Sequence, residues 1–308
     1  MSAPATERAG RPEAIQAVPV RHPGRWVASI LVLVVVAMFV HGITTNERWD
    51  WSTQFQYILS PQVLRGVWTT VWLTIVSMLI GVALGAILAV MRLSPNPILS
   101  GAAWVYIWVF RGTPIIVQLF LWANVAYLYR EMTVGVPFGP GFLTMQTRDL
   151  IPYFMAALLG LGLNEGAYMA EIVRAGILSV DEGQEEAATA IGMSRGQTLR
   201  RIVLPQAMRV IVPPTGNETI SMLKTTSLVL IIPYGELFFV TGNLGTTLFK
   251  PFPFAILASI WYLAMTSLMM IGQYYIERHY AKGAMRNLPP TPIQKIRVRL
   301  MSSGKERR

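Results

Sequence analysis

Polar side chains recur at helical spacing inside two long apolar stretches of this 308-residue sequence. In the first stretch, one helical face carries three polar residues and a fourth stands beside it: Asn164, Tyr168, Glu171 and Glu165. In the second stretch, Asn217, Ser221 and Lys224 repeat that spacing, and Glu218 and Thr225 form an adjacent row. Carboxylates and amides on one side, with an ammonium and hydroxyls on the other, suit a solute that carries both charges, such as a free amino acid. We therefore expect the two faces to line a passage for a small polar solute.

Charges within these stretches also have a simpler explanation. A charge in lipid costs a few kcal/mol, so it needs a partner or a water-filled path. Glu171 and Arg174 are three residues apart and favour a structural ion pair along one helix. Glu165 and Lys224 lie nearer the middle of their stretches, so contact with solute and buried pairing both remain open for them.

No residue pattern in the chain supports catalysis. The sequence GMSRG at 192–196 matches the Gly-x-Ser-x-Gly elbow of serine hydrolases, but that elbow needs a preceding strand, and the residues before it are predicted to be helical. The three histidines, His22, His41 and His279, lie far away in sequence. The chain has no cysteine, no Walker-type glycine loop and no His-Glu-x-x-His pattern. We expect no enzymatic site, metal site or cofactor in this chain.

The composition is typical of a membrane protein. Hydrophobic residues make up 53% of the chain and charged residues only 14%, below the quarter that is typical of soluble domains. Several apolar runs approach or exceed the roughly 20 residues that a helix needs to cross the hydrocarbon layer. Six spanning segments are predicted: 26–40 (extendable to 43), 67–91, 114–128, 151–177, 207–239 and 254–276. The predicted fold class is therefore an all-α integral membrane protein.

Two stretches between these segments are not predicted to span. Residues 100–110 are too short to cross, so we place them along the cytoplasmic surface, before segment three starts at Pro114. Residues 129–150 are polar, contain glycine and proline, and should be exposed.

Prolines and glycines should shape two of the spanning segments. Pro213 and Pro214 lack backbone donors and should bend or break segment five, with Gly216 loosening it further. Gly81 and Gly85 in segment two have the spacing that permits close contact between membrane helices.

Positive charges predict the orientation. Six crossings place both termini on one side of the membrane. Of the 26 lysines and arginines, twenty fall on that side, Arg111 among them, five fall on the other, and Lys224 lies within segment five. Cytoplasmic segments are enriched in such residues, so both termini are predicted to be cytoplasmic. This distribution explains the net charge of +10 without a nucleic-acid partner.

The charged stretch 181–205 cannot lie in lipid and is predicted to form a helix-turn-helix. Ser179 with Glu182 fits a capping box that opens the first helix, which should end at Gly192. A second capping box is formed by Ser194 and Gln197. It should open a helix that stops at Pro205, which lacks a backbone donor. Small residues are expected at the exposed bend: Ala187, Ala188 and Ala190.

This loop carries a recognisable motif. The run EAATAIGMSRGQTLRRIVLP at 186–205 resembles the EAA signature of ABC importer permeases. In that family the motif implies a cytoplasmic coupling helix that docks in a cleft of the ATPase, where small side chains allow close approach. The resemblance assigns the following residues to this joint: Gly183, Glu186, Ala187, Ala188, Gly192, Arg200, Leu204 and Pro205.

Further motifs look like the polar amino-acid branch of that family. They are RGTP at 111–114 with Gln118, GAYMAEIVRAGILSV at 166–180, PQAMRVIVPPTGN at 205–217 and LKTTSL at 223–228. This resemblance covers about residues 60–280. It implies a type I importer transmembrane domain in the bacterial cytoplasmic membrane and adds Gln118 to the pathway. The implied partners are two ABC ATPases that bind ATP and magnesium, a second permease subunit, identical or related, and an extracytoplasmic amino-acid-binding protein.

Four parts are predicted along the chain: a cytoplasmic segment 1–25, an uncleaved anchor with an outer loop 26–60, a permease domain 61–280 and a basic cytoplasmic tail 281–308. Other functions remain open. An importer of opines, oligopeptides or another polar solute would use the same fold. A secondary transporter or channel would need only the polar faces, and the EAA loop argues against it. An intramembrane enzyme would need a catalytic set that the sequence lacks.

Overall fold

The computed structural model describes residues 23–136 and 139–280. Most of the predicted 1–25 segment and the whole 281–308 tail lie outside the described residues. The chain divides into two compact units between Trp49 and Asp50. The first contains α1 (Pro23–Thr45) and the short helix η1 (Glu47–Trp49). No residue of α1 is buried, as expected for an apolar helix whose sides face lipid, and predicted segment one is confirmed as a helix.

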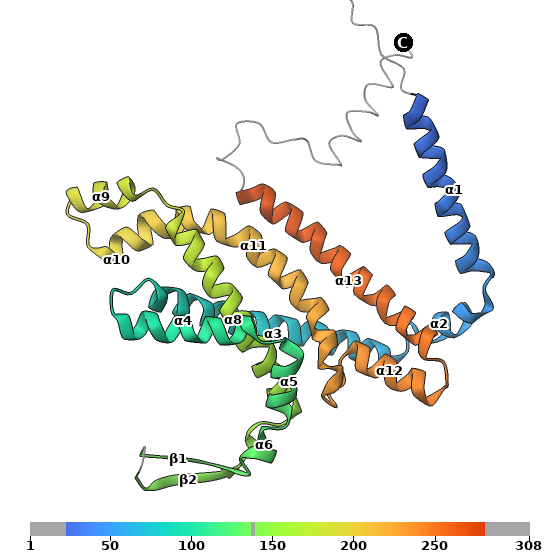
Figure 1. The fold of residues 1–308 in the computed structure, drawn as a ribbon, viewed down its shortest axis with the longest axis horizontal. Helices are drawn as coiled ribbons and strands as arrows, with labels where there is room; N and C mark the ends of the chain where they lie inside the picture. The colour runs from blue at the N-terminus through green and yellow to red at the C-terminus, as the bar shows by residue number, and fades with distance from the viewer. Residues whose placement is uncertain (1–22, 137–138, 281–308) are drawn as a thin grey trace, which may run out of the picture. The chain divides into compact units, whose positions relative to one another are not determined.

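The second unit is a group of helices with one small hairpin (Figure 1). Its long helices are α3 (Pro61–Arg92), α4 (Pro97–Gly112), α8 (Tyr153–Leu178), α11 (Leu204–Thr225) and α13 (Pro251–Tyr280). The shorter helices are α2 (Trp51–Tyr57), α5 (Ile115–Ala123), α6 (Val125–Leu128), α7 (Thr147–Leu150), α9 (Glu182–Ala190), α10 (Arg195–Thr198), η2 (Leu199–Val203), η3 (Thr226–Ile231) and α12 (Leu237–Thr247). Predicted segments two, four and six are confirmed as α3, α8 and α13.

Helices α3 and α8 pack along one another, and glycines allow their close approach. A Cβ added to Gly81 would collide with the side chain of Glu165, whose Cβ would lie only 2.7 Å away. A Cβ on Gly85 would collide with Met169 in the same way. The predicted close contact at these two glycines is confirmed, and it fixes the face that α8 turns toward α3.

Helices α4 and α5 confirm that a helix begins after Pro114, and they show a sharp bend before it. They are bent by 100° at Thr113 and Pro114, and together they are apolar and long enough to form one broken span. Ala103 and Ile107 of α4 are buried in a cluster with residues of α3 and α8. The run 100–110 therefore packs within the helix group, and its position relative to the membrane stays a prediction.

The described residues within 129–150 are mostly exposed, as predicted, and part of them forms regular structure. Strands β1 (Glu131–Gly135) and β2 (Gly141–Gln146) form an antiparallel hairpin. Thr133 and Thr144 face each other across it, with their hydroxyl oxygens 2.9 Å apart. This hairpin is the exception to the predicted all-α fold within the described residues, and its period-two pattern is too short to stand out in the sequence.

Segment five is the prediction that differs most from the structure. Helix α11 runs through Pro213 and Pro214 without a break, and Nε2 of Gln273 on α13 donates to the Pro213 carbonyl at 2.8 Å. Gly216 lies against that same glutamine, and its lack of a side chain allows α11 and α13 to pack closely. The neighbouring helix thus supports a backbone that the prolines weaken.

The break in this region comes later, between η3 and α12. The carboxylate of Glu236 is fully buried there and accepts hydrogen bonds from the backbone N–H groups of Phe238 and Phe239, at 2.8 and 2.5 Å. It also accepts from the hydroxyl of Tyr262 on α13 at 2.9 Å. This carboxylate caps α12 and gives the unwound stretch before it a fixed position. The predicted span 207–239 is therefore two helices with an interruption.

By length and composition, three described helices can cross a membrane, namely α1, α3 and α13, or four if the bent pair α4–α5 is one span. Helix α8, with 26 residues, is long enough to span, but polar side chains reduce the hydropathy of α8 and α11. The count of six spans stays a prediction.

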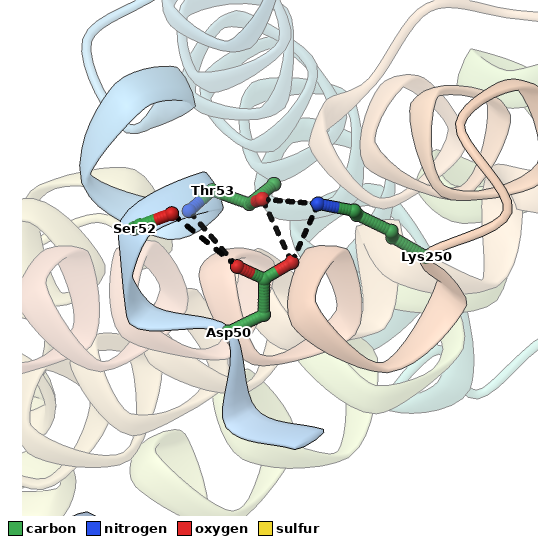
Figure 2. A network of polar contacts seen from close by, with 4 residues as sticks. All are labelled: Asp50, Ser52, Thr53 and Lys250. Atoms are coloured by element: carbon green, nitrogen blue, oxygen red, sulfur yellow. Dashed lines mark hydrogen bonds and ion pairs between the residues drawn. The ribbon is translucent and has the colours of Figure 1, made fainter. Parts of the chain in front are cut away.

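At one end of the second unit, an ion pair joins α2 to the start of α13 (Figure 2). Nζ of Lys250 lies 2.7 Å from Oδ2 of Asp50 and donates to Oγ1 of Thr53 at 2.8 Å. Nearby, Nε1 of Trp261 on α13 donates to the carbonyl of Ile58 at 2.9 Å. These contacts hold the short helix α2 against the long helix α13.

Candidate functional site

The bend between α4 and α5 leaves backbone carbonyls that two buried amides satisfy. Nε2 of Gln118 donates to the Phe110 carbonyl at 2.9 Å, and to the carbonyl and hydroxyl oxygens of Thr113 at 3.1 and 2.8 Å. Nδ2 of Asn164, on α8, donates to the same Phe110 carbonyl at 2.9 Å and to Oε1 of Gln118 at 3.2 Å. A helix end without such partners would be costly in an apolar surrounding, so these bonds stabilise the bend.

A cavity of about 530 Å³ opens beside this bend. Figure 1 shows α4, α5, α8 and α11 coming together in this part of the fold. Backbone and side chains of the bend form one wall, and α8 and α11 form the others. Its polar and charged lining residues are Arg111, Thr113, Asn164, Glu165, Tyr168, Glu218, Ser221 and Thr225.

The cavity contains two carboxylates and one guanidinium. Glu165 is 5% exposed, and its Oε1 is buried without a hydrogen-bond partner. Glu218 from α11 is half-buried and close enough for its charge to act on Glu165, while Arg111 acts in turn on Glu218. Within the described part of the chain, none of these three groups forms an ion pair within 4 Å. The arrangement leaves carboxyl oxygen atoms available to a cation that enters the cavity.

Arg111 is held over an aromatic ring. Its guanidinium carbon lies 5.2 Å from the centroid of the Tyr168 ring, a cation–π contact between the bend and α8. A positive charge thus lines the same cavity as the two carboxylates. The orientation count had placed Arg111 on the cytoplasmic side, and that assignment stays a prediction.

The loop at 181–205 has a helix-turn-helix form, as predicted. Helix α9 is capped by Asp181, whose carboxylate accepts from the backbone N–H of Gly183 at 2.8 Å. The helix ends at Ala190, and Gly192 has a φ of +80°, a conformation that favours glycine. The chain therefore reverses at Gly192, as the sequence predicted.

Helix α10 also begins as predicted. The hydroxyl of Ser194 accepts from the N–H of Gln197 at 3.4 Å, and the Gln197 side chain accepts from the N–H of Ser194 at 2.9 Å. This reciprocal capping box ties the start of the second helix.

Three details of the loop differ from prediction. Ser179 donates to the Gly176 carbonyl at 2.6 Å and does not cap α9, because Asp181 is better placed. Ala188 is buried, since it faces η2, whereas Ala187 and Ala190 are exposed. The second helix does not stop at Pro205. It continues through the π-helical turn η2 into α11, with the proline in the first turn of α11, where no N–H donor is needed.

Comparison with known proteins identifies the architecture. A family model described as "Binding-protein-dependent transport system inner membrane component" matches residues 81–282. The chain belongs to this family. It is a permease subunit of an ABC importer.

Individual relatives agree. The permease is 49% identical to the arginine transport system permease protein ArgU of Corynebacterium glutamicum over 280 residues, which cover 90% of this chain and 87% of the relative. It is 37% identical to the nopaline transport system permease protein NocM of Agrobacterium fabrum, over 71% of this chain and 89% of that protein.

A crystal structure of an amino acid ABC transporter with histidines also matches the permease. The TM-score is 0.61 and the identity 33%, over 71% of this chain and 94% of that chain. The methionine transporter MetNI in an inward-facing conformation shares the fold, with a TM-score of 0.57 at 20% identity, over 72% of this chain and 97% of that chain. The helical fold of the permease is that of an importer transmembrane domain.

The structure separates the predicted pathway residues of the permease into three groups. Those that line the cavity are Asn164, Glu165, Tyr168, Ser221 and Thr225. Gln118 supports the bend behind the wall, and Glu171 forms a bidentate pair with Arg174, with Arg174 Nη2 and Nε at 2.7 and 3.2 Å from the same carboxylate oxygen. Asn217 and Lys224 are exposed on α11 and do not line the cavity.

Two charged residues of the cavity were not predicted to line the pathway. Arg111 was placed on the cytoplasmic side, and Glu218 was assigned with Thr225 to the row beside Asn217 without a role of its own. A usable signal existed for Glu218, because Ser221 and Thr225 follow it at i+3 and i+7 and line the same cavity.

Proposed function

We propose that this permease conducts a cationic amino acid such as arginine. The proposal rests on a cavity that is lined by two acidic residues, Glu165 and Glu218, and by one basic residue, Arg111. A basic amino acid carries two positive groups and one carboxylate at neutral pH. Its cationic groups would meet the two carboxylates, and Arg111 would receive its carboxylate in a charge-assisted hydrogen bond. The identity to an arginine permease supports the same substrate class.

The complete pathway would need a second permease subunit, identical or related. The polar side chains of Asn217 and Lys224 on α11 are exposed beside the cavity, on a helix expected to lie within the membrane. Charges there need a partner or water, so a facing subunit would provide their surroundings. An open half-cavity on each subunit would then join into one central passage.

The driving force would come from two partner ATPases that bind ATP and magnesium, since the chain belongs to a family of binding-protein-dependent transport components. Helix α9 and the turn at Gly192 would fit into a cleft of each ATPase. Glu186, Ala187, Arg200, Leu204 and Pro205 are exposed around this joint, and Gly183 lies in its first turn. Closure of the ATPases would move α9 and, through η2 and α11, the wall of the cavity.

The subunit would reside in the bacterial cytoplasmic membrane with both termini in the cytoplasm. The positive charges support this orientation even without Arg111. An extracytoplasmic binding protein would then deliver the solute to the side that carries the β1–β2 hairpin. Cysteines introduced at Ser303 and Gly141 should react with an impermeant maleimide only at Gly141 in intact cells. Labelling at position 303 would overturn the orientation.

Uptake by the reconstituted complex tests the substrate class. Arginine should be imported in preference to glutamine. Glu218→Gln should lower arginine uptake about tenfold or more, the usual scale for one lost hydrogen bond to a charged group. Glu131→Gln, on the exposed hairpin, is the matched control and should not change it. Equal uptake by Glu165→Gln, Glu218→Gln and the parent protein would refute the assignment, and preferential uptake of nopaline would redirect it to opines.

A further inference from the structure

A second pocket, of about 490 Å³, lies next to the cavity between α4 and α8. The two share Arg111, Gly112 and Tyr168, so the cation–π pair of Arg111 and Tyr168 stands at their boundary. The other lining residues of this inner pocket are Arg92, Trp104, Ile107, Trp108 and Glu171. A solute in the cavity would meet the inner pocket directly beyond Arg111.

The inner pocket leads toward the coupling loop. Arg92 is the last residue of α3, and the turn that follows it, residues 93–95, lines a third pocket together with Glu185, Thr189 and Arg195 of α9 and α10. On α8, Glu171 is one turn closer to the coupling loop than Tyr168. The inner pocket therefore lies between the cavity and the end of the fold that carries α9, which the proposed orientation makes the cytoplasmic side.

The balance of acidic and basic side chains differs between the two pockets. The cavity has two carboxylates and one guanidinium. In the inner pocket, the carboxylate of Glu171 is neutralised by Arg174 at 2.7 Å. Arg92 and Arg111 remain, and neither forms an ion pair with a carboxylate within the part of the chain that the structure describes. The inner pocket is thus net positive.

The surroundings of these arginines strengthen their effect. Trp104 and Trp108 stack on each other with ring centroids 6.0 Å apart and form an apolar wall of the pocket. Low-polarity walls focus the field of nearby charges. The faces of the two rings attract cations weakly, but the effect is smaller than that of a full charge. Arg92 is also held in place, since its Nη1 donates to Oγ of Ser100 at 3.0 Å.

We propose that the inner pocket is a charge filter, in which Arg92 together with Arg111 excludes simple cations from the carboxylate-lined cavity. A basic amino acid can pass because its carboxylate pairs with the arginines as it leaves. Metal cations and polyamines of the cytoplasm have no carboxylate and are repelled. The acidic cavity would otherwise attract such ions whenever it opens inward. This inference rests on the proposed function for the direction of the pathway, but not on which amino acid is carried.

The absence of cysteine in the chain permits a direct test. A single reporter, Ser221→Cys, is placed in the cavity wall of the assembled transporter in inside-out vesicles. Its rates of modification by a quaternary-ammonium methanethiosulfonate and by the sulfonate counterpart are compared. The sulfonate should react faster. Adding Arg92→Gln should raise the cationic rate and lower the anionic rate, each by about fivefold, the effect of one unit charge a few ångströms from the path in water.

Matched variants separate charge from structure. Ser100→Ala removes the hydrogen bond to Arg92 but keeps the charge, so it should change the ratio of the two rates far less than Arg92→Gln does. Arg92→Lys also keeps the charge and should behave in the same way. If the Arg92→Gln variant fails to assemble, the transporter with Ser221→Cys alone gives the test. Salt at 1 M screens charges, so it should reduce the excess of the sulfonate rate over the quaternary-ammonium rate. A ratio that neither salt nor Arg92→Gln alters would overturn the filter. Because no amino acid is transported in this assay, failure of arginine uptake would leave its result interpretable.

Discussion

Lys250 and Asp50 form an ion pair at 2.7 Å that joins the start of α13 to the N-cap of α2 (Figure 2). Asp50 has a positive φ of 44° and accepts from the backbone N–H and the hydroxyl of Thr53, at 3.3 and 2.8 Å. The carboxylate thus organises a turn whose conformation is otherwise unfavourable for a residue with a side chain. Helix α2 depends on this one charged group.

The pH dependence of this contact follows from the pKa of Asp50. Hydrogen bonds from Lys250 and then from Thr53 lower the pKa of the carboxyl to about 2. A lowered folded-state pKa stabilises the fold above the unfolded pKa of about 4, and the contribution is lost as the pH falls toward 2. Asp50→Asn should therefore lower the melting temperature of the purified permease at pH 6, with the difference from the parent shrinking below pH 4. Asp149→Asn, which removes the exposed 3.6 Å pair with Arg148, is the control and should have little effect.

The contact between Gly81 and Glu165 predicts a sharp response to one methyl group. Gly81→Ala would push the Glu165 side chain away, and overpacking of this kind costs about 1–3 kcal/mol. We expect less protein in the membrane and lower uptake per molecule, because Glu165 would leave its place in the cavity. The matched control is Gly101→Ala on α4, where a Cβ meets nothing within 4 Å and alanine favours the helix. Normal uptake and abundance in Gly81→Ala would show that the helices can separate without consequence.

The sequence predicted individual helices better than it predicted how they meet. Periodicity and length located α3, α8 and α13, because an apolar run of membrane length leaves few alternatives. Capping residues located the turn at Gly192. The break at Thr113 and Pro114 was predicted from the Gly-Thr-Pro run, but its surroundings were not. Its support comes from Asn164 on another helix, which only the tertiary structure reveals.

For the candidate site, too, the sequence predicted positions on one helix better than contacts between helices. Helical spacing placed Asn164, Tyr168 and Glu165 on a common side of α8, and the cavity contains all three. It could not tell that Lys224 points elsewhere, since the rotation of α11 is set by its packing against α8 and α13. Helical spacing also could not place Arg111 beside Tyr168, because this contact depends on the direction in which α4 runs after the turn that follows α3.

The turn at Gly192 should control coupling to the ATPase. Its φ of +80° is costly for a residue with a Cβ, by about 1 kcal/mol. Gly192→Ala should therefore reduce co-purification of the ATPase and ATP-dependent uptake while the permease still inserts. The control, Gly196→Ala in α10, has ordinary helical geometry and open space, so it should behave as the parent. Unchanged ATPase binding by Gly192→Ala would remove this turn from the docking surface.

Lys224 gives the last prediction. Its side chain is exposed on α11 and forms no ion pair with another described residue, whereas Glu171 is already paired with Arg174. Lys224→Met should therefore leave the amount of permease in the membrane unchanged, because no buried carboxylate is left unpaired.

The double variants Lys224→Met with Glu165→Gln or Glu171→Gln test this directly. Breaking a buried pair costs about 3–5 kcal/mol, and removing both partners restores much of it. If Lys224 stabilised either carboxylate, the single change would lower abundance and a double change would recover it. The structure predicts neither effect. Uptake per molecule then reports the pathway: a fall in Lys224→Met at normal abundance would place this ammonium beside the passing solute in the assembled transporter, and poor rescue by Lys224→Arg would show that a compact cation is required there.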